Sequence, residues 1–167
     1  GLKFSTVLPK QVQLSAVISI YTDSYSSREW CRREIIVAKR YNVPLVIANC
    51  IVDKDERGFP YMGNVPIARM EPNDLKRIDL IVGLLLEEVF KDFLWRCRIE
   101  LVKNEKEPSV IYLPRPPELI SLTAITTPKA IVVYPDPPLG EEEIKLFHEI
   151  SPNVELITMN QWIAGAY

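Results

Sequence analysis

Two short apolar runs, separated by one helical segment, constrain the fold of this chain most strongly. Residues 16–21 and 43–50 are each apolar enough to form a buried strand, and residues 28–41 between them have the spacing of a helix with one apolar face. Strands that alternate with helices in this way run parallel, because the helix carries the chain back across the sheet. The sequence therefore predicts an α/β fold with a mainly parallel sheet.

One carboxylate interrupts the apolar face of the helix predicted at residues 28–41. On a helix, Trp30, Glu34 and Ala38 share one face, so Glu34 occupies a position at which a core residue is expected. Apolar neighbours would partly desolvate this carboxylate. Because ligands of open α/β sheets bind in the crevice at the strand ends, Glu34 is a candidate catalytic residue. An ion pair between Glu34 and a neighbouring Arg or Lys, without any catalytic role, would also explain a carboxylate at this position.

Polar residues follow the first predicted strand. Asp23, Ser24 and Ser26 lie at the carboxyl end of that strand, where they could bind polar groups of a ligand. Trp30, one helical turn before Glu34, could form a wall of the same pocket. The simpler interpretation gives the loop residues ordinary turn and capping roles, with Ser27 as the N-cap of the helix, and places Trp30 in the core.

These residues resemble the central segment of a known family. A strand, the loop Asp-Ser-Tyr-Ser-Ser at residues 23–27 and the motif Trp-Cys-x-x-Glu-x-x-x-Ala at residues 30–38 are similar to a Toll/interleukin-1 receptor (TIR) domain of bacterial or plant type. The strand at residues 43–50 and the runs at residues 57–61 and 77–79 agree with the same family. The resemblance covers about residues 12–105 and implies a flavodoxin-like sheet with flanking helices.

The resemblance also implies a reaction. In enzymatic TIR domains, the glutamate of this motif catalyses the cleavage of nicotinamide from NAD, and that glutamate matches Glu34 here. NAD would be the substrate rather than a cofactor, with Trp30, Asp23, Ser24 and Ser26 around it. The resemblance further implies a cytoplasmic protein of innate immunity, antiphage defence or stress signalling that acts when assembled. The alternative is a non-catalytic TIR module that self-associates or recruits other such domains.

A third interpretation is a receiver-like α/β signalling domain. It would use Asp23 or Asp136 as a phosphoryl acceptor, because each aspartate follows a predicted strand. The lysine and the acidic pair that such a domain needs are not at a recognisable spacing. For Asp136, which lies between two prolines, a turn is the simpler interpretation.

One departure from the family pattern leaves the enzymatic interpretation open. A complete TIR domain begins with a further strand, a helix and a loop that helps to enclose the nucleotide. Only about fifteen residues precede the strand at residues 16–21 here. We therefore expect residues 1–106 to form an N-terminally incomplete TIR-like domain, which ends with a long helix at residues 73–103.

The remaining residues, 107–167, predict a second and smaller α/β unit. Apolar runs at residues 109–113, 130–134 and 154–158 indicate strands, and residues 141–150 and 160–164 indicate helices. A unit of about sixty residues buries little surface by itself. We expect it to pack on the first domain or to extend its sheet.

Composition excludes several other classes of function. A formal net charge of −2 gives no electrostatic reason to bind nucleic acid or an anionic membrane, and the longest apolar stretch, residues 78–86, is too short to span a bilayer. An odd number of cysteines, three, is typical of a reduced cytoplasmic protein. Because His148 is the only histidine, we predict neither a Ser-His-Asp relay nor a metal site.

Overall fold

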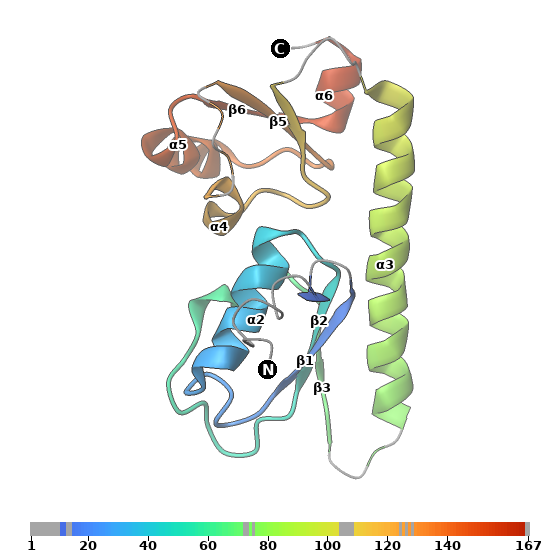
Figure 1. The fold of residues 1–167 in the computed structure, drawn as a ribbon, viewed down its shortest axis with the longest axis vertical. Helices are drawn as coiled ribbons and strands as arrows, with labels where there is room; N and C mark the ends of the chain where they lie inside the picture. Colours follow the sequence, from blue (N-terminus) through green and yellow to red (C-terminus); the bar gives the residue numbers. More distant parts are fainter. Residues whose placement is uncertain are drawn as a thin grey trace, which may run out of the picture. The chain divides into compact units, whose positions relative to one another are not determined.

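The chain divides into two compact units, Gly1–Lys91 and Asp92–Tyr167, each with its own three-stranded sheet (Figure 1). The computed structural model describes residues 11–12, 15–71, 74, 76–103, 109–123, 125, 127 and 129–165. The division falls inside a long helix, whereas the sequence places the junction after that helix, at residue 106.

The first unit alternates strands and helices, as the sequence predicts. Its strands are β1 (Val17–Tyr21), β2 (Leu45–Asn49) and β3 (Ile67–Arg69), and its helices are α2 (Glu29–Arg40), the short 3-10 helix η1 (Pro60–Met62) and the start of α3 (Lys76–Val102). The strands lie in the order β1-β2-β3 and all pair in parallel, with Val17 opposite Leu45 and Ile47 opposite Ile67. The predicted α/β fold with a parallel sheet is confirmed.

The end of α2 has a local cause. Asn42 has a φ of 53°, the left-handed conformation that commonly ends a helix and that asparagine tolerates. Pro44 follows two residues later and has no backbone N–H with which to continue the helix. The chain therefore leaves α2 and enters β2 within a few residues.

Both faces of β2 are buried, which explains why its sequence is apolar throughout. On one face, Leu45 and Ile47 pack with Ile35 and Ala38 of α2, and all four side chains are at most 1% exposed. On the other face, Val46 and Ala48 pack with Ile81 of α3. The two helices thus cover opposite sides of the central strand.

The second unit repeats this arrangement with strands of its own. Its elements after α3 are β4 (Val110–Tyr112), α4 (Leu119–Leu122), β5 (Ala130–Tyr134), α5 (Glu141–Ile150), β6 (Val154–Thr158) and α6 (Met159–Ile163). The order is β4-β5-β6 and all strands are parallel. The sequence left open whether these strands extend the first sheet; they form a separate one.

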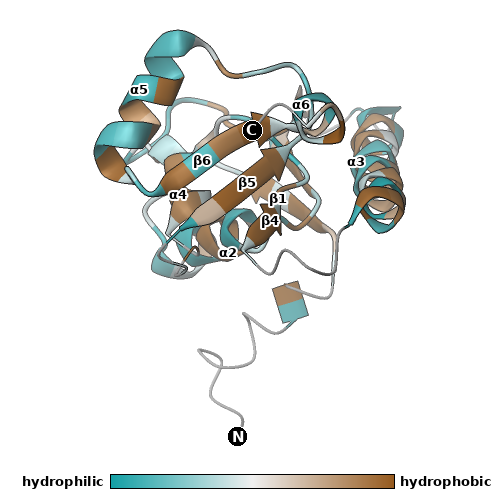
Figure 2. Ribbon diagram, turned by 90° about the horizontal axis from the view of Figure 1, so that it is seen from above, coloured by the Kyte–Doolittle hydropathy of each residue, from teal (hydrophilic) through white to brown (hydrophobic). Residues whose placement is uncertain are grey.

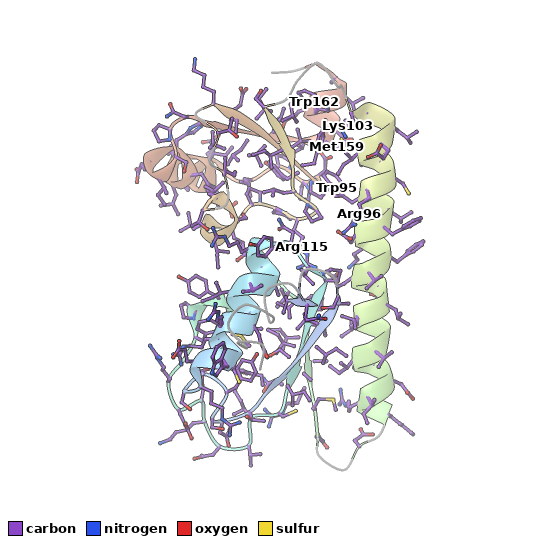
Figure 3. The ribbon with its side chains drawn as sticks, viewed as in Figure 1. Trp95, Arg96, Lys103, Arg115, Met159 and Trp162 are labelled. Carbon is purple, nitrogen blue, oxygen red and sulfur yellow. The ribbon has the colours of Figure 1, made fainter. Side chains whose placement is uncertain are left out.

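The central strand β5 is again buried on both faces and is hydrophobic along its length in Figure 2. On one side, Val132 and Tyr134 pack with Phe147 of α5. On the other side, Val133 packs with the group Trp95, Met159 and Trp162 that Figure 3 labels. None of the described helices combines the length and the hydropathy needed to cross a bilayer.

The packing of α2 on the first sheet makes a stability prediction. Replacing Ile35, which is 0% exposed, by Ala should leave a cavity and lower the free energy of unfolding by about 3 kcal/mol. Urea unfolding followed by far-UV circular dichroism measures this loss. Arg40→Ala, on the exposed end of the same helix, is the control and should change stability by less than about 0.5 kcal/mol. Equal effects of the two substitutions would contradict the packing described here.

Candidate functional site

The loops that follow β1 and β2 meet at the carboxyl edge of the first sheet. Parallel pairing places the last residues of these strands, Tyr21 and Asn49, opposite each other. Two backbone hydrogen bonds then join the loops, from the Cys50 amide to the Tyr21 carbonyl at 2.8 Å and from the Glu56 amide to the Asp23 carbonyl at 3.0 Å. This is the edge at which open α/β sheets bind ligands.

A network of three side chains, Tyr21, Ser26 and Asp55, fixes this edge. The Tyr21 and Ser26 hydroxyl oxygens lie 2.8 Å apart, and both hydroxyls donate to the same Asp55 oxygen, Ser26 at 3.0 Å. Ser26 is 0% exposed. Its hydroxyl is used in a hydrogen bond within the loop pair, and its role as a substrate-binding residue stays a prediction.

The network also changes how its members bind protons. Burial and the hydrogen bond to Asp55 raise the pKa of Tyr21. Burial acts to raise the pKa of Asp55, but the hydrogen bonds from Tyr21, Ser26 and the loop backbone outweigh it and hold that pKa below its ordinary value. Asp55 is therefore ionised at neutral pH.

Like Asp55, Asp23 connects the two loops through its carboxylate. Its carboxylate accepts hydrogen bonds from the backbone amides of Val52 at 2.9 Å and Asp53 at 3.4 Å, so it holds the loop after β2. Like Asp23, Asp136 accepts a backbone hydrogen bond, from the Asn160 amide at 3.3 Å. Both aspartates considered as phosphoryl acceptors thus bind backbone amides.

The start of α2 differs from the sequence prediction. Arg28 is the N-cap residue, and no side chain caps the helix there, so the prediction that Ser27 is the N-cap is wrong. Ser27 instead donates its hydroxyl to the Ser24 carbonyl at 2.8 Å, which closes the loop on itself. The Arg32 guanidinium donates to the Ser26 carbonyl at 2.6 Å and ties the loop to the helix.

Glu34 lies in the second turn of α2 and is partly buried. Burial raises the pKa of its carboxyl above the ordinary value of 4.5. Within the described part of the chain, this carboxylate forms no hydrogen bond and no ion pair. The alternative in which an Arg or Lys neutralises Glu34 is therefore not seen among these residues.

Two neutral side chains, Tyr25 and Cys31, lie close enough to Glu34 for its charge to act on them. Tyr25 is 6% exposed and donates to the Cys31 carbonyl at 3.1 Å. Burial, together with the nearby Glu34 charge, raises the pKa of Tyr25 to about 12, although the Ser19 hydroxyl lowers it. Burial and the Glu34 charge also raise the pKa of the Cys31 thiol. Arg28 and Arg32 act to lower that pKa, but their effect is the smaller one. Cys31 is therefore a protonated thiol at neutral pH and a poor nucleophile.

Trp30 is more exposed than a core residue. Its side chain is 41% exposed, and the Arg33 guanidinium lies over its ring at 5.3 Å from the centroid. The interpretation that places Trp30 in the core is wrong. Helical spacing gives the face on which a residue lies but not its depth, and Trp30 lies in the first turn of α2, at the edge of the packed surface.

Sequence reasoning missed Tyr21, Tyr25 and Asp55. In the sequence, Tyr21 is simply the last residue of an apolar run that predicts a strand. Asp55 lies in a charged segment for which the sequence predicts a surface loop. The sequence does contain a pattern that could have indicated Asp55. This residue follows β2, and Tyr21 ends the neighbouring strand β1, so both lie at the same edge of a parallel sheet.

Two further observations concern possible ligands. Among the described residues, no group of three or more His, Cys, Asp or Glu side chains could hold a metal ion. The second unit contains an open cavity of about 590 Å³ at the amino ends of its strands, which His148 and Lys129 help to line. None of the residues proposed for catalysis or substrate binding lines that cavity.

Comparisons of this chain with family models, with curated proteins and with solved structures give no match. The resemblance to TIR domains therefore stays a prediction from the sequence motif at residues 23–38.

The loop network leads to a stability prediction. Ser26→Ala should lower the free energy of unfolding by about 2 kcal/mol, because it removes a buried hydrogen bond to a charged group. Ser24→Ala is the matched control, since the Ser24 side chain makes no hydrogen bond among the described residues, and it should cost less than about 0.5 kcal/mol. Chemical unfolding measures both values. If Ser26→Ala is as stable as Ser24→Ala, the network does not hold the loops.

The raised pKa of Glu34 predicts a pH dependence of stability. Folding binds the Glu34 proton more tightly, so its contribution is fully present below the unfolded pKa of 4.5 and is lost as pH rises through the higher folded pKa. Glu34→Gln has no charge to bury, so its stability relative to the wild type should increase between pH 4 and pH 7.5. Thermal unfolding across that range measures the difference. A constant difference would show that folding leaves the pKa of Glu34 unchanged, and one that falls with rising pH would show that the fold stabilises the charge; either result contradicts the raised pKa.

Proposed function

We propose that this chain cleaves the bond between nicotinamide and ribose in NAD, with Glu34 as the catalytic residue. One observation carries the proposal: a partly buried carboxylate with a raised pKa, without an ion pair among the described residues, lies on the helix whose motif resembles that of TIR domains. Burying a charged carboxylate without a partner lowers the stability of the fold, and such groups are concentrated at functional sites. NAD is the substrate in this proposal, and no cofactor is needed.

The proposed role of Glu34 follows from the positive charge that develops on the ribose during the reaction. When the bond between the ribose carbon and the nicotinamide nitrogen breaks, its electron pair leaves with the nicotinamide, which becomes neutral. The ribose then develops an oxocarbenium-like positive charge, which an adjacent carboxylate stabilises. A water oxygen bonds to the same carbon and releases one proton, so the products are nicotinamide and ADP-ribose.

The neighbouring residues take different parts in this proposal. Trp30, which is 41% exposed, forms the side of the substrate site. Asp23 and Ser26 are positioning residues rather than ligands, because their side chains hold the two loops together. Of the three polar residues predicted to bind NAD, Ser24 is the one whose side chain makes no hydrogen bond among the described residues.

The proposal includes a cytoplasmic location and a role in defence or stress signalling, as the TIR resemblance implies. It is supported by the three free cysteines, Cys31, Cys50 and Cys97, which are typical of a reducing compartment.

A non-catalytic association module is the second candidate function. It is favoured by the exposure of Ile18 and Ile20, which are 37% and 62% exposed on β1. β1 is the edge strand of the described sheet, and edge strands can accept a further chain. In this case Glu34 would have no catalytic role.

The test is nicotinamide release from NAD by the purified chain at high concentration. Glu34→Gln should lower the rate at least about 100-fold, because it removes the charge that stabilises the transition state. Glu29→Gln, which changes an exposed carboxylate on the same helix, should keep the rate. Circular dichroism should show both variants folded. Absence of release by the wild-type chain, or full release by Glu34→Gln, would refute the catalytic proposal.

A further inference from the structure

We propose that Tyr25 is a positioning residue for Glu34: its hydroxyl holds the first turn of α2, and with it the carboxylate one turn further along. In the proposed function, on which this inference rests, Glu34 must face the ribose of NAD. Tyr25 itself lies outside the helix, in the loop that follows β1.

The start of α2 lacks the usual means of fixing a helix end. The first amides of a helix have no partner within it, and a Ser, Thr, Asp or Asn side chain normally binds one of them. Arg28 occupies the N-cap position instead, and its side chain forms no capping hydrogen bond. The first turn of α2, which carries Trp30, therefore depends on other contacts.

Two hydrogen bonds between the loop and the helix supply such contacts. The Tyr25 hydroxyl donates to the Cys31 carbonyl at 3.1 Å, and the Arg32 guanidinium donates to the Ser26 carbonyl at 2.6 Å. Of the two donors, only Tyr25 is a buried side chain, at 6% exposed. Cys31 and Glu34 are three residues apart on the helix, so the carbonyl that Tyr25 binds lies one turn before the carboxylate.

Tyr25 is itself held at several points. Its backbone amide donates to the Thr22 carbonyl at 2.9 Å, and its carbonyl accepts from the Arg28 amide at 3.2 Å. Its ring packs edge-on against Tyr21, with 5.4 Å between the centroids, and the Tyr21 hydroxyl donates to Asp55. Contacts thus run without a break from the loop after β2, through the two tyrosines, to the start of α2.

Tyr25 also lies near the carboxylate that it is proposed to position. Burial raises the pKa of Tyr25 to about 12 against the opposite effect of the Ser19 hydroxyl, and the nearby charge of Glu34 raises it further. The other titratable groups that act on Tyr25 are Cys31 and Tyr21. Tyr25 is therefore a neutral hydrogen-bond donor at neutral pH.

Removing the hydroxyl alone tests this role. Tyr25→Phe keeps a buried ring but cannot donate to the Cys31 carbonyl, so the start of α2 should loosen and admit water to Glu34. The kcat of nicotinamide release should fall at least about tenfold, with KM within about twofold of the wild-type value, because the carboxylate no longer faces the reacting carbon. In an NMR titration without NAD, the pKa of Glu34 in this variant should move towards 4.5.

Tyr41→Phe is the matched control, since it removes a hydroxyl at the other end of the same helix. Tyr41 is the C-cap residue of α2 and is 49% exposed, and its hydroxyl makes no hydrogen bond among the described residues. This variant should keep the wild-type kcat, KM and pKa of Glu34. Circular dichroism should show both variants folded.

Three results would overturn the proposal. They are a wild-type kcat in Tyr25→Phe; an unchanged pKa of Glu34 in that variant, which would mean that the hydroxyl only stabilises the fold; and equal changes in Tyr41→Phe. Absence of nicotinamide release by the wild-type chain would refute the proposed function, whereas the pKa values of Glu34 would still decide whether Tyr25 positions it.

Discussion

The parallel pairing of β1 with β2 is the constraint on which the first unit depends. It places the ends of both strands at one edge, so the loops that carry Asp23 and Asp55 lie side by side. It also requires a crossover, which α2 provides. Because α2 must bury Ile35 and Ala38 on the sheet, Glu34, which directly precedes Ile35 and lies one turn before Ala38, is drawn towards the same packed surface.

Local patterns predicted most of the secondary structure. The strands at residues 17–21 and 45–49, the helix at residues 29–40 and the helix at residues 141–150 follow from apolar periodicity, which depends on neighbouring residues alone. Asn42 and Pro44 mark the end of α2 for an equally local reason. The three strands of the second unit were found in the same way.

The side-chain network could not be predicted, because its members are distant in sequence. Asp55 lies 29 residues after Ser26 and 34 after Tyr21, and only the strand order brings them together. The exposure of Trp30 was missed because a helical face says nothing about the depth of burial at its end. For Glu34, the position on the helix followed from spacing, whereas the raised pKa depends on the folded surroundings.

The proposed function has its physical basis in a break in the pattern of apolar and polar residues. Glu34 is a charge where the packing favours an apolar residue. Such breaks are expected at functional sites. The central claim is that the fold leaves Glu34 partly desolvated, with no compensating charge from the residues that the structure describes. A carbon-detected NMR titration of the Glu34 carboxyl measures this most directly: the account predicts a pKa above 4.5, and a pKa at or below 4.5 would contradict it.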